Sequence, residues 1–262
     1  MNIYPNAYYN YKKQRTTAYH IEKKRIQDKI LEIYNKYSGI PGYRMMRIYL
    51  QRSDIYLSEV TVHKYMKELN LKSTIIPQKT TYKKGESYKR FKNHLNRNFY
   101  ADSPNQKWCT DFTCIFMKDG SKRYNCSIMD LYDKFIVATK NGPHLDANLA
   151  IETLKLALEL TEHPKELLLH SDQGSPYTSQ AFTEYCEQNN ITQSMSKAGC
   201  PYDNSPMERF YATFKSEFIQ KQKFSTDEEL NTKTYDYVYH YYNRIRPHSS
   251  NAYLTPFEKR NR

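Results

Sequence analysis

The sequence lacks the features that mark several common classes of protein. Its five cysteines, at positions 109, 114, 126, 186 and 200, form no CxxC pair, so no zinc finger is encoded. Their odd number, in a chain without a signal-like apolar N-terminus, favours reduced thiols and a cytoplasmic location. No stretch approaches the roughly 18 consecutive apolar residues of a membrane-spanning helix. No internal repeat, collagen-like period or coiled-coil period is present.

Acidic side chains are scarce in the first 100 residues. The whole chain of 262 residues has 40 lysines and arginines against 28 aspartates and glutamates, a formal net charge of +12. Residues 1–100 contain 21 basic and 7 acidic side chains, a balance of +14, so residues 101–262, with 19 and 21, sum to −2. Any single basic cluster can be a solvated surface, but this bias favours a polyanionic partner for the N-terminal part.

The N-terminal part is predicted to contain an arm, a small helical module and a linker. After a basic and aromatic arm at residues 1–20, apolar positions recur with helical spacing from residue 26 to residue 37. A short helix around residues 46–50 follows, and Ser58 is a candidate N-cap for a third helix. Residues 21–71 therefore resemble a helix-turn-helix module, which binds DNA or docks another protein. Residues 72–99 are basic, have no apolar period and are predicted as a linker.

From residue 100 the pattern changes to that of an α/β domain. Segments at 108–117, 125–132 and 135–139, rich in aromatic and β-branched residues and separated by turn signals, predict an antiparallel meander. Helices around 151–158, 178–189 and 206–220 alternate with strands at 167–169 and 191–195. This order predicts one domain with a mixed sheet over residues 100–262, including a C-terminal helix.

Three carboxylates in this domain attract attention by their positions. Asp111 lies in the middle of an apolar strand, where a charge costs several kcal/mol unless it is paired; a hydrogen-bonded acid at a strand edge is the alternative. Asp172 follows a strand expected to be central and parallel, at the end where ligand sites of open sheets collect. Glu208 falls in the first turn of a helix that Pro206 begins, with 35 residues between it and Asp172. Lys215 lies two helical turns farther on the same face.

Four stretches, in this order, resemble DDE transposases of the retroviral-integrase superfamily, specifically the OrfB protein of the insertion-sequence-three family. They are residues 108–113 (Trp-Cys-Thr-Asp-Phe-Thr), 170–175 (His-Ser-Asp-Gln-Gly-Ser), 203–217 (Asp-Asn-Ser-Pro-Met-Glu-Arg-Phe to Lys-Ser-Glu) and 241–256 (Tyr-Tyr-Asn-Arg-Ile-Arg-Pro-His to Leu-Thr-Pro). The helical module also resembles the region that precedes the core in that family. A D–D–E spacing alone is weak support, whereas four ordered motifs are strong.

The resemblance implies an RNase H-like core in which Asp111, Asp172 and Glu208 are catalytic and bind two Mg2+ ions, with Mn2+ able to substitute. Water would cut one strand and expose a 3′-OH, which would then attack a second phosphodiester, without a protein nucleophile. The implied partners are double-stranded DNA, as terminal repeats and as target, and further copies of the chain on that DNA. An upstream OrfA product, or a fusion with it, is a further expected partner that is not recognisable in this sequence.

Seven other residues are expected to support the acids or to contact DNA: His170, Gln173, Asn204, Lys215, Arg244, Arg246 and His248. His170 and Asn204 flank the acids and either orient them or the scissile phosphate, or make structural hydrogen bonds. Gln173 is expected beside the site, as support for the acids or as a DNA contact. The lysine points toward DNA or is solvated. The last three, in the C-terminal motif, either bind phosphate or lock the last helix onto the core. The turn after Asp172, at Gln173 and Gly174, is expected to leave room for the DNA backbone.

Three alternatives share part of this pattern. An RNase H-like nuclease would have the fold and the acids, but the N-terminal module and the motifs at 203–217 and 241–256 favour transposition. A non-catalytic DNA-binding regulator would keep the module but has no need for three acids in this order. A degenerate, inactive copy would have no reason to retain all three carboxylates.

Overall fold

The computed structural model describes residues 5–13, 15–75, 91–161, 163–197 and 199–262. Within these residues no helix is long and apolar enough to cross a bilayer. The chain divides into two compact units, Met1–Pro77 and Gln78–Arg262.

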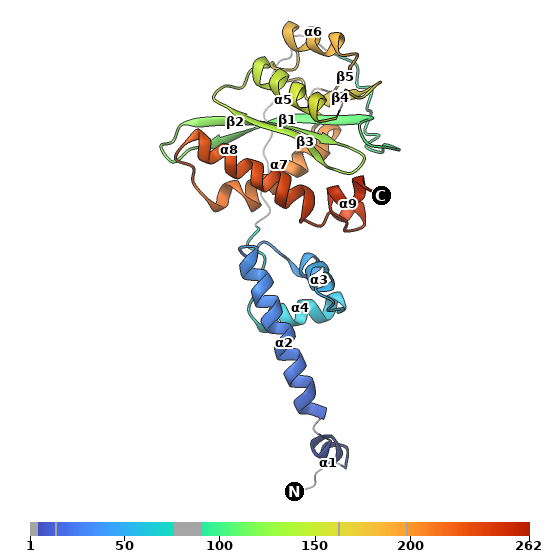
Figure 1. Ribbon diagram of the computed structural model, residues 1–262, viewed down its shortest axis with the longest axis vertical. Coiled ribbons are helices and arrows are strands. Elements are labelled where there is room, and N and C mark those ends of the chain that lie inside the picture. Colours follow the sequence, from blue (N-terminus) through green and yellow to red (C-terminus); the bar gives the residue numbers. More distant parts are fainter. Residues whose placement is uncertain (1–4, 14, 76–90, 162, 198) are drawn as a thin grey trace. The chain divides into compact units, whose positions relative to one another are not determined.

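The first unit is a small helical bundle, drawn in blue and cyan in Figure 1. Its helices are α1 (Pro5–Lys12), α2 (Arg15–Lys36), α3 (Tyr43–Gln51) and α4 (Glu59–Glu68). The predicted apolar face is confirmed, because Ile26, Ile30 and Ile33 of α2 are buried against α3 and α4. Ser58 is also confirmed as an N-cap, since its side chain accepts the N–H of Thr61. α1 lies within the predicted arm, where the sequence indicated no helix.

Both ends of the predicted linker are more ordered than its sequence indicates. Residues 72–75 pack on the first unit, where Ser73 Oγ donates to Ile40 O at 2.7 Å and Thr74 N donates to Gly39 O at 2.9 Å. At the other end Leu95 is 2 % exposed, in the core of the second unit. Isolated contacts of this kind leave no periodic signal in a basic sequence. The middle of the predicted linker, residues 76–90, lies outside the described residues.

The second unit is built on a five-stranded sheet of order β3-β2-β1-β4-β5. Its strands are β1 (Lys107–Phe116), β2 (Lys122–Asp130), β3 (Ile136–Gly142), β4 (Leu168–Ser171) and β5 (Thr192–Met195). The first three pair antiparallel, as the meander prediction requires, and β4 is parallel to both β1 and β5. The strand that leads to Asp172 is therefore central and parallel, as expected.

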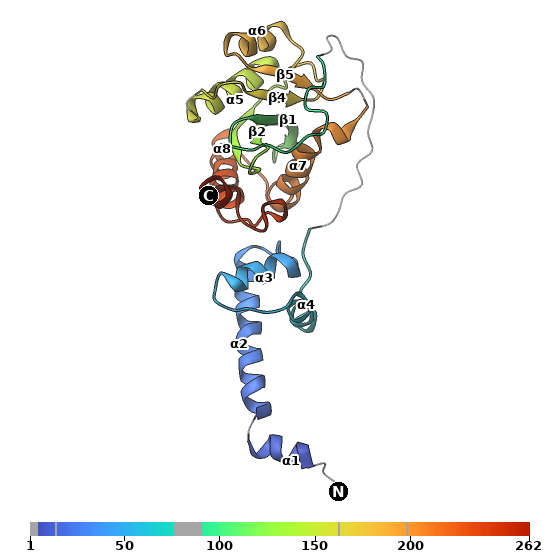
Figure 2. The same cartoon turned by 90° about the vertical axis from the view of Figure 1, so that its right-hand side faces the viewer.

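Helices cover both faces of this sheet, as Figures 1 and 2 show. On one face lie α5 (Ala147–Leu160) and α6 (Gln180–Gln188), and on the other α7 (Ser205–Glu217), α8 (Asp227–Tyr235) and α9 (Pro256–Arg260). Short helical turns connect them: η1 (Pro201–Asn204), η2 (Ile219–Lys221), η3 (Asp236–Tyr242) and η4 (Ser249–Asn251). Neighbouring residues of β1 point to opposite faces, so Trp108 packs with α5 and α6 while Cys109 packs with α7.

The C-terminal helix is attached to the sheet through a buried ion cluster. Thr255 and Glu258 form a capping box that begins α9. Arg260, in the last turn, pairs with Asp130 and Asp133 at 2.6 Å each, and both aspartates are fully buried. The end of the chain is thereby fixed to the turn between β2 and β3.

Candidate active site

Pairing of β1 with β4 brings the first two acids together. Cys109 of β1 lies opposite His170 of β4 in a parallel ladder. Asp111 and Asp172 each stand two residues beyond this pair, so they follow the same face of adjacent strands. The two misfit carboxylates of the sequence are therefore neighbours at the carboxyl end of β4.

The third acid is positioned by hydrogen bonds between α7 and the backbone of β1. Asn204, immediately before α7, donates from Nδ2 to Thr110 O at 3.3 Å. Tyr211 on α7 places its hydroxyl 2.8 Å from Asp111 O, to which it donates, and 3.1 Å from Asn125 O on β2. Glu208 lies between these two anchors, in the first turn of α7 as predicted. Tyr211 was not predicted as a site residue, because nothing local marks a partner 100 residues away.

The protonation of the three acids shows that they share one electrostatic environment. Burial, repulsion from Asp172 and, more weakly, repulsion from Glu208 together raise the pKa of Asp111 to about 8, against the Phe112 N–H. Burial also raises the pKa of Asp172, against the Gly174 N–H, and that of Glu208. Lys215 offsets part of this charge at Asp111.

Across the ranges that the structure describes, Asp111 and Asp172 each have only one carboxylate oxygen in a hydrogen bond. Asp111 Oδ1 accepts the Phe112 N–H at 2.7 Å, and Asp172 Oδ1 accepts the Gly174 N–H at 2.8 Å. In the described part of the chain, the second oxygen of each makes no hydrogen bond. Among the described residues, no three His, Cys, Asp or Glu side chains already stand in an arrangement that could hold a metal ion. The acids are thus within electrostatic reach of one another, with their side chains apart.

Gly174 lies against the Asp172 carboxylate. A Cβ at Gly174 would lie 2.8 Å from Asp172 Oδ1, the oxygen that its own N–H already binds. A side chain here would therefore crowd the carboxylate, while the expected room for the DNA backbone stays a prediction.

His170 and Gln173 face β5 and the loop after it. His170 is fully buried, with Nδ1 at 2.9 Å from Ser194 Oγ and Nε2 at 3.1 Å from Ser196 Oγ. Burial lowers the pKa of His170 to about 4, so its ring is neutral. Gln173 donates from Nε2 to Ser196 O at 2.9 Å. Of the two roles left open for these residues, their contacts favour the structural one, which fixes the Asp172 loop.

Asp203 is a further structural residue that sequence reasoning passed over. It is 2 % exposed, and its carboxylate accepts Arg97 Nε at 2.6 Å, Asn93 Nδ2 at 3.0 Å and the Lys197 N–H at 3.0 Å. These bonds lower its pKa although burial opposes them. Asp203 therefore ties the segment before β1 to the turn that leads into α7.

Two residues of the C-terminal motif, Arg246 and His248, are half-buried. Arg246 donates to both oxygens of Glu217 at 2.8–3.1 Å, and Tyr237 donates to the same carboxylate at 3.2 Å. Burial alone would lower the pKa of Arg246, but Glu217 outweighs it and the pKa is raised. Burial lowers the pKa of His248 to about 4. Arg244 is exposed and stacks over the Phe257 ring at 4.3 Å.

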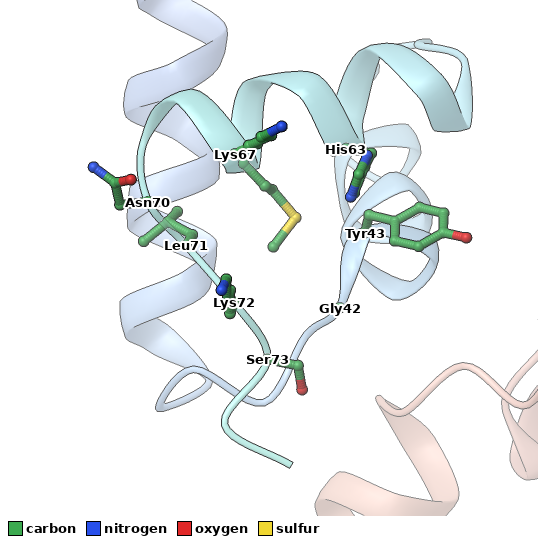
Figure 3. A pocket seen from close by; sticks show the side chains of 9 residues that line it. Gly42, Tyr43, His63, Lys67, Asn70, Leu71, Lys72 and Ser73 are labelled. Atoms are coloured by element: carbon green, nitrogen blue, oxygen red, sulfur yellow. The ribbon is translucent and has the colours of Figure 1, made fainter. Parts of the chain in front are cut away.

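A hollow of about 870 Å³ lies in the first unit, between α4, the start of α3 and the segment after α4. Figure 3 shows its lining, with Tyr43, His63 and Lys67 on the helices and Lys72 on the following segment. None of the three acids lines it, so it has no part in the acidic site.

Models of two known domains match this chain. The integrase core domain matches residues 101–201 and, in a second model, residues 189–256. An HTH-like domain matches residues 21–79. These matches cover the acids and the helical unit, respectively.

Curated relatives are similar over most of the chain. The sequence is 32% identical over 236 residues to the putative transposase InsK for insertion sequence element IS150 of Escherichia coli (strain K12), covering 90% of this chain and 83% of that protein. It is 32% identical over 253 residues to the transposase for insertion sequence element IS904 of Lactococcus lactis subsp. lactis (strain IL1403), covering 95% and 99%.

A solved structure shares the fold. A chain in the cryo-EM structure of the simian T-cell lymphotropic virus intasome in complex with PP2A regulatory subunit B56 gamma superposes with a TM-score of 0.52 at 14% identity, covering 89% of this chain and 74% of that one. The predicted fold class, an RNase H-like mixed-sheet core preceded by a helix-turn-helix module, is confirmed.

Proposed function

The chain belongs to the insertion-sequence-three family of transposases, and we propose that Asp111, Asp172 and Glu208 are the residues with which it cuts and joins DNA. The observation that carries this assignment is their convergence from three separate motifs. β1 and β4 bring two of them side by side, and α7 is fixed to the β1 backbone on both sides of the third. A regulator without catalysis would gain nothing from bringing three carboxylates together.

The donor set suits hard divalent cations. The three side chains supply only carboxylate oxygens, the ligands that Mg2+ and Mn2+ prefer. The free oxygens of Asp111 and Asp172, and a pKa of Asp111 that stays raised although Lys215 lowers it, indicate a site that can take further positive charge. We propose two ions, which when bound would activate the attacking oxygen and stabilise the leaving oxygen.

The chain's own residues have defined tasks in this proposal. Asn204 and Tyr211 keep α7 on β1, so the Glu208 carboxylate stays beside Asp111. Lys215, two turns along the same helix, is half-buried within electrostatic reach of Asp111 and would contact a DNA phosphate. No side chain is required as a nucleophile, because water and then a DNA 3′-OH attack the phosphodiester.

The first unit supplies a second contact with DNA in this proposal. Its helix α4 exposes His63, Lys64 and Lys67 on one side, and Arg44 is exposed on α3. Such a basic helical surface fits the phosphate backbone or a groove of duplex DNA at the terminal repeats. Assembly of several copies on DNA, an OrfA partner and a cytoplasmic location remain predictions of the family resemblance.

The decisive experiment is a strand-transfer assay with the full chain, Mg2+ or Mn2+, and duplex DNA that carries the terminal repeats flanking its coding region. Asp111→Asn, Asp172→Asn and Glu208→Gln should each abolish joined products while leaving the melting temperature unchanged or higher. Glu187→Gln, which alters an exposed acid on α6, serves as the matched control and should retain activity. Cleavage of RNA–DNA hybrids without joining would instead support the nuclease, and DNA binding without cleavage the regulator.

Metal binding is tested separately from activity. Titration of Mn2+ followed by electron paramagnetic resonance should show two bound ions per chain in the parent protein. Each acid variant should bind fewer ions or bind them more weakly, whereas Glu187→Gln should match the parent. Equal binding by all four variants would refute the ligand assignment.

A further inference from the structure

Tyr202 is an aromatic residue that the fold leaves in solvent beside the acids. It belongs to η1, the turn that leads directly into α7, and is 72 % exposed. The two residues that follow it, Asp203 and Asn204, are 2 % and 4 % exposed. A tyrosine normally gains free energy by burying its ring. An exposed ring directly before two buried residues therefore suggests a surface for a ligand.

The turn that carries Tyr202 is fixed in place. Asp203 binds Arg97, Asn93 and the Lys197 backbone, as described above, and Asn204 binds Thr110 O. With its neighbours fixed, the Tyr202 ring loses little conformational freedom when a partner stacks on it. A preorganised contact of this kind binds more tightly than the same group on a mobile loop.

The turn is also close to the reacting centre. Asn204 contacts the carbonyl of Thr110, the residue before Asp111. Two residues of chain span at most about 7 Å, so the Tyr202 backbone lies within that distance of Asn204. Base pairs in duplex DNA are stacked about 3.4 Å apart. The ring is consequently within reach of the first nucleotides beside a phosphate held at the acids.

The charges around the ring match a nucleic acid. Arg97 and Lys197 carry exposed side chains on the segments that Asp203 joins, and Arg209 is exposed in the first turn of α7. Arg97 pairs at 2.6 Å with Asp203, the residue that follows Tyr202. Cations that can contact phosphates beside an aromatic face that can stack on a base are the two components of single-strand binding sites.

We propose that Tyr202 is the stacking platform for an unpaired nucleobase next to the scissile phosphate at the element's end. This rests on the proposed function, to which it adds a contact that recognises an opened DNA end. Stacking on the ring compensates for the lost base pair and presents the phosphate to the acids. Because every base has a π-face, the contact tolerates any terminal sequence.

The test uses the full chain carrying Asp111→Asn, which binds DNA without cutting it, and a duplex end with 2-aminopurine as the terminal base. Binding should change the probe's fluorescence as the base leaves the DNA stack and lies on Tyr202. Tyr202→Phe should retain this change because it keeps the ring. Tyr202→Ala should abolish it and weaken binding by roughly five- to 150-fold, the loss of one stacked base. An end with a mismatched terminal pair should recover part of that loss.

Tyr100→Ala is the matched control, since Tyr100 is 69 % exposed in the same unit and its backbone contacts Lys107, at the start of β1. It should behave as the parent. If Tyr202→Ala also behaves as the parent, or if Tyr202→Phe loses the signal as fully as Tyr202→Ala does, the stacking proposal is wrong. Either result leaves the acids untouched, because their assignment depends on strand transfer by the protein with Asp111 intact.

Discussion

Replacing Arg246 or Glu217 tests whether the C-terminal motif binds DNA or stabilises the fold. The Glu217 side chain is 4 % exposed and that of Arg246 is 16 % exposed, and the pair shares three hydrogen bonds. Removing one partner of a buried pair leaves an uncompensated charge, which costs about 3–5 kcal/mol. We expect Arg246→Gln and Glu217→Gln each to lower the free energy of unfolding by an amount near the lower limit of this range, because the Arg246 side chain is still partly exposed to solvent. A unit of this size would lose roughly 6–12 °C in melting temperature.

The double variant Glu217→Gln/Arg246→Gln separates the two roles. Two neutral amides leave no buried charge, so we expect it to recover at least about 2 kcal/mol relative to the sum of the single changes. Urea unfolding measures this free energy. Filter binding to duplex DNA over a salt series, on the folded double variant, should give an unchanged slope of log affinity against log salt. Loss of a real phosphate contact would instead lower the slope by about 1.

Arg244→Gln is the control, since Arg244 is exposed two positions earlier and should affect stability by less than about 0.5 kcal/mol. A stability loss under about 1 kcal/mol for Arg246→Gln, together with a smaller salt slope for the double variant, would refute the structural role. Arg246 would then be a phosphate ligand that Glu217 merely accompanies when DNA is absent.

Three further predictions follow from the contacts around the acids. Gly174→Ala should lower strand transfer at least about tenfold and weaken Mn2+ binding, because its Cβ would displace the Asp172 carboxylate; unchanged Mn2+ affinity would contradict this. Tyr211→Phe and Tyr237→Phe should each lower the free energy of unfolding in urea by about 1–2 kcal/mol. Only Tyr211→Phe should reduce strand transfer. Equal activity of the two variants would show that the Tyr211 hydroxyl at β1 does not position the acids. The pKa of His170 is lowered from 6.5 to about 4, so the unfolded chain binds more protons between these values and stability falls as pH drops from 6.5 to 4. The loss is at most about 3 kcal/mol, and His170→Gln should flatten this part of the pH profile of unfolding.

The acids themselves were predictable because each of the first two violates a local rule. A carboxylate within the apolar strand 108–116, and another directly after a buried strand, are costly in their own sequence neighbourhood. Glu208 is ordinary for a first helical turn and became informative through its distance from Asp172 and its position before Lys215. Strand order and helix faces followed from periodicity for the same reason, since burial leaves a regular pattern.

The groups that fix the acids could not be predicted in this way. Tyr211 and Asp203 depend on partners about 100 residues distant, and a polar side chain carries no local sign of which backbone it will bind. Arg246 belongs to a motif that the sequence did reveal, but its role did not follow from the motif. An arginine in a buried ion pair and an arginine that binds phosphate look the same in a sequence, and only the contact with Glu217 distinguishes them.

The placement of these groups explains why each acid lies within a longer motif. Burial, repulsion from Asp172 and, more weakly, repulsion from Glu208 raise the pKa of Asp111, so folding alone would favour moving the three carboxylates apart. Other residues of the same motifs counteract this repulsion. Gln173 anchors the loop of Asp172 to Ser196, and Asn204 and Tyr211 fasten the helix of Glu208 to β1. The motif residues thus hold the backbone against the repulsion, which leaves the carboxylates themselves free to turn toward a cation. Substituting an anchor should therefore lower metal affinity even where the three acids are intact.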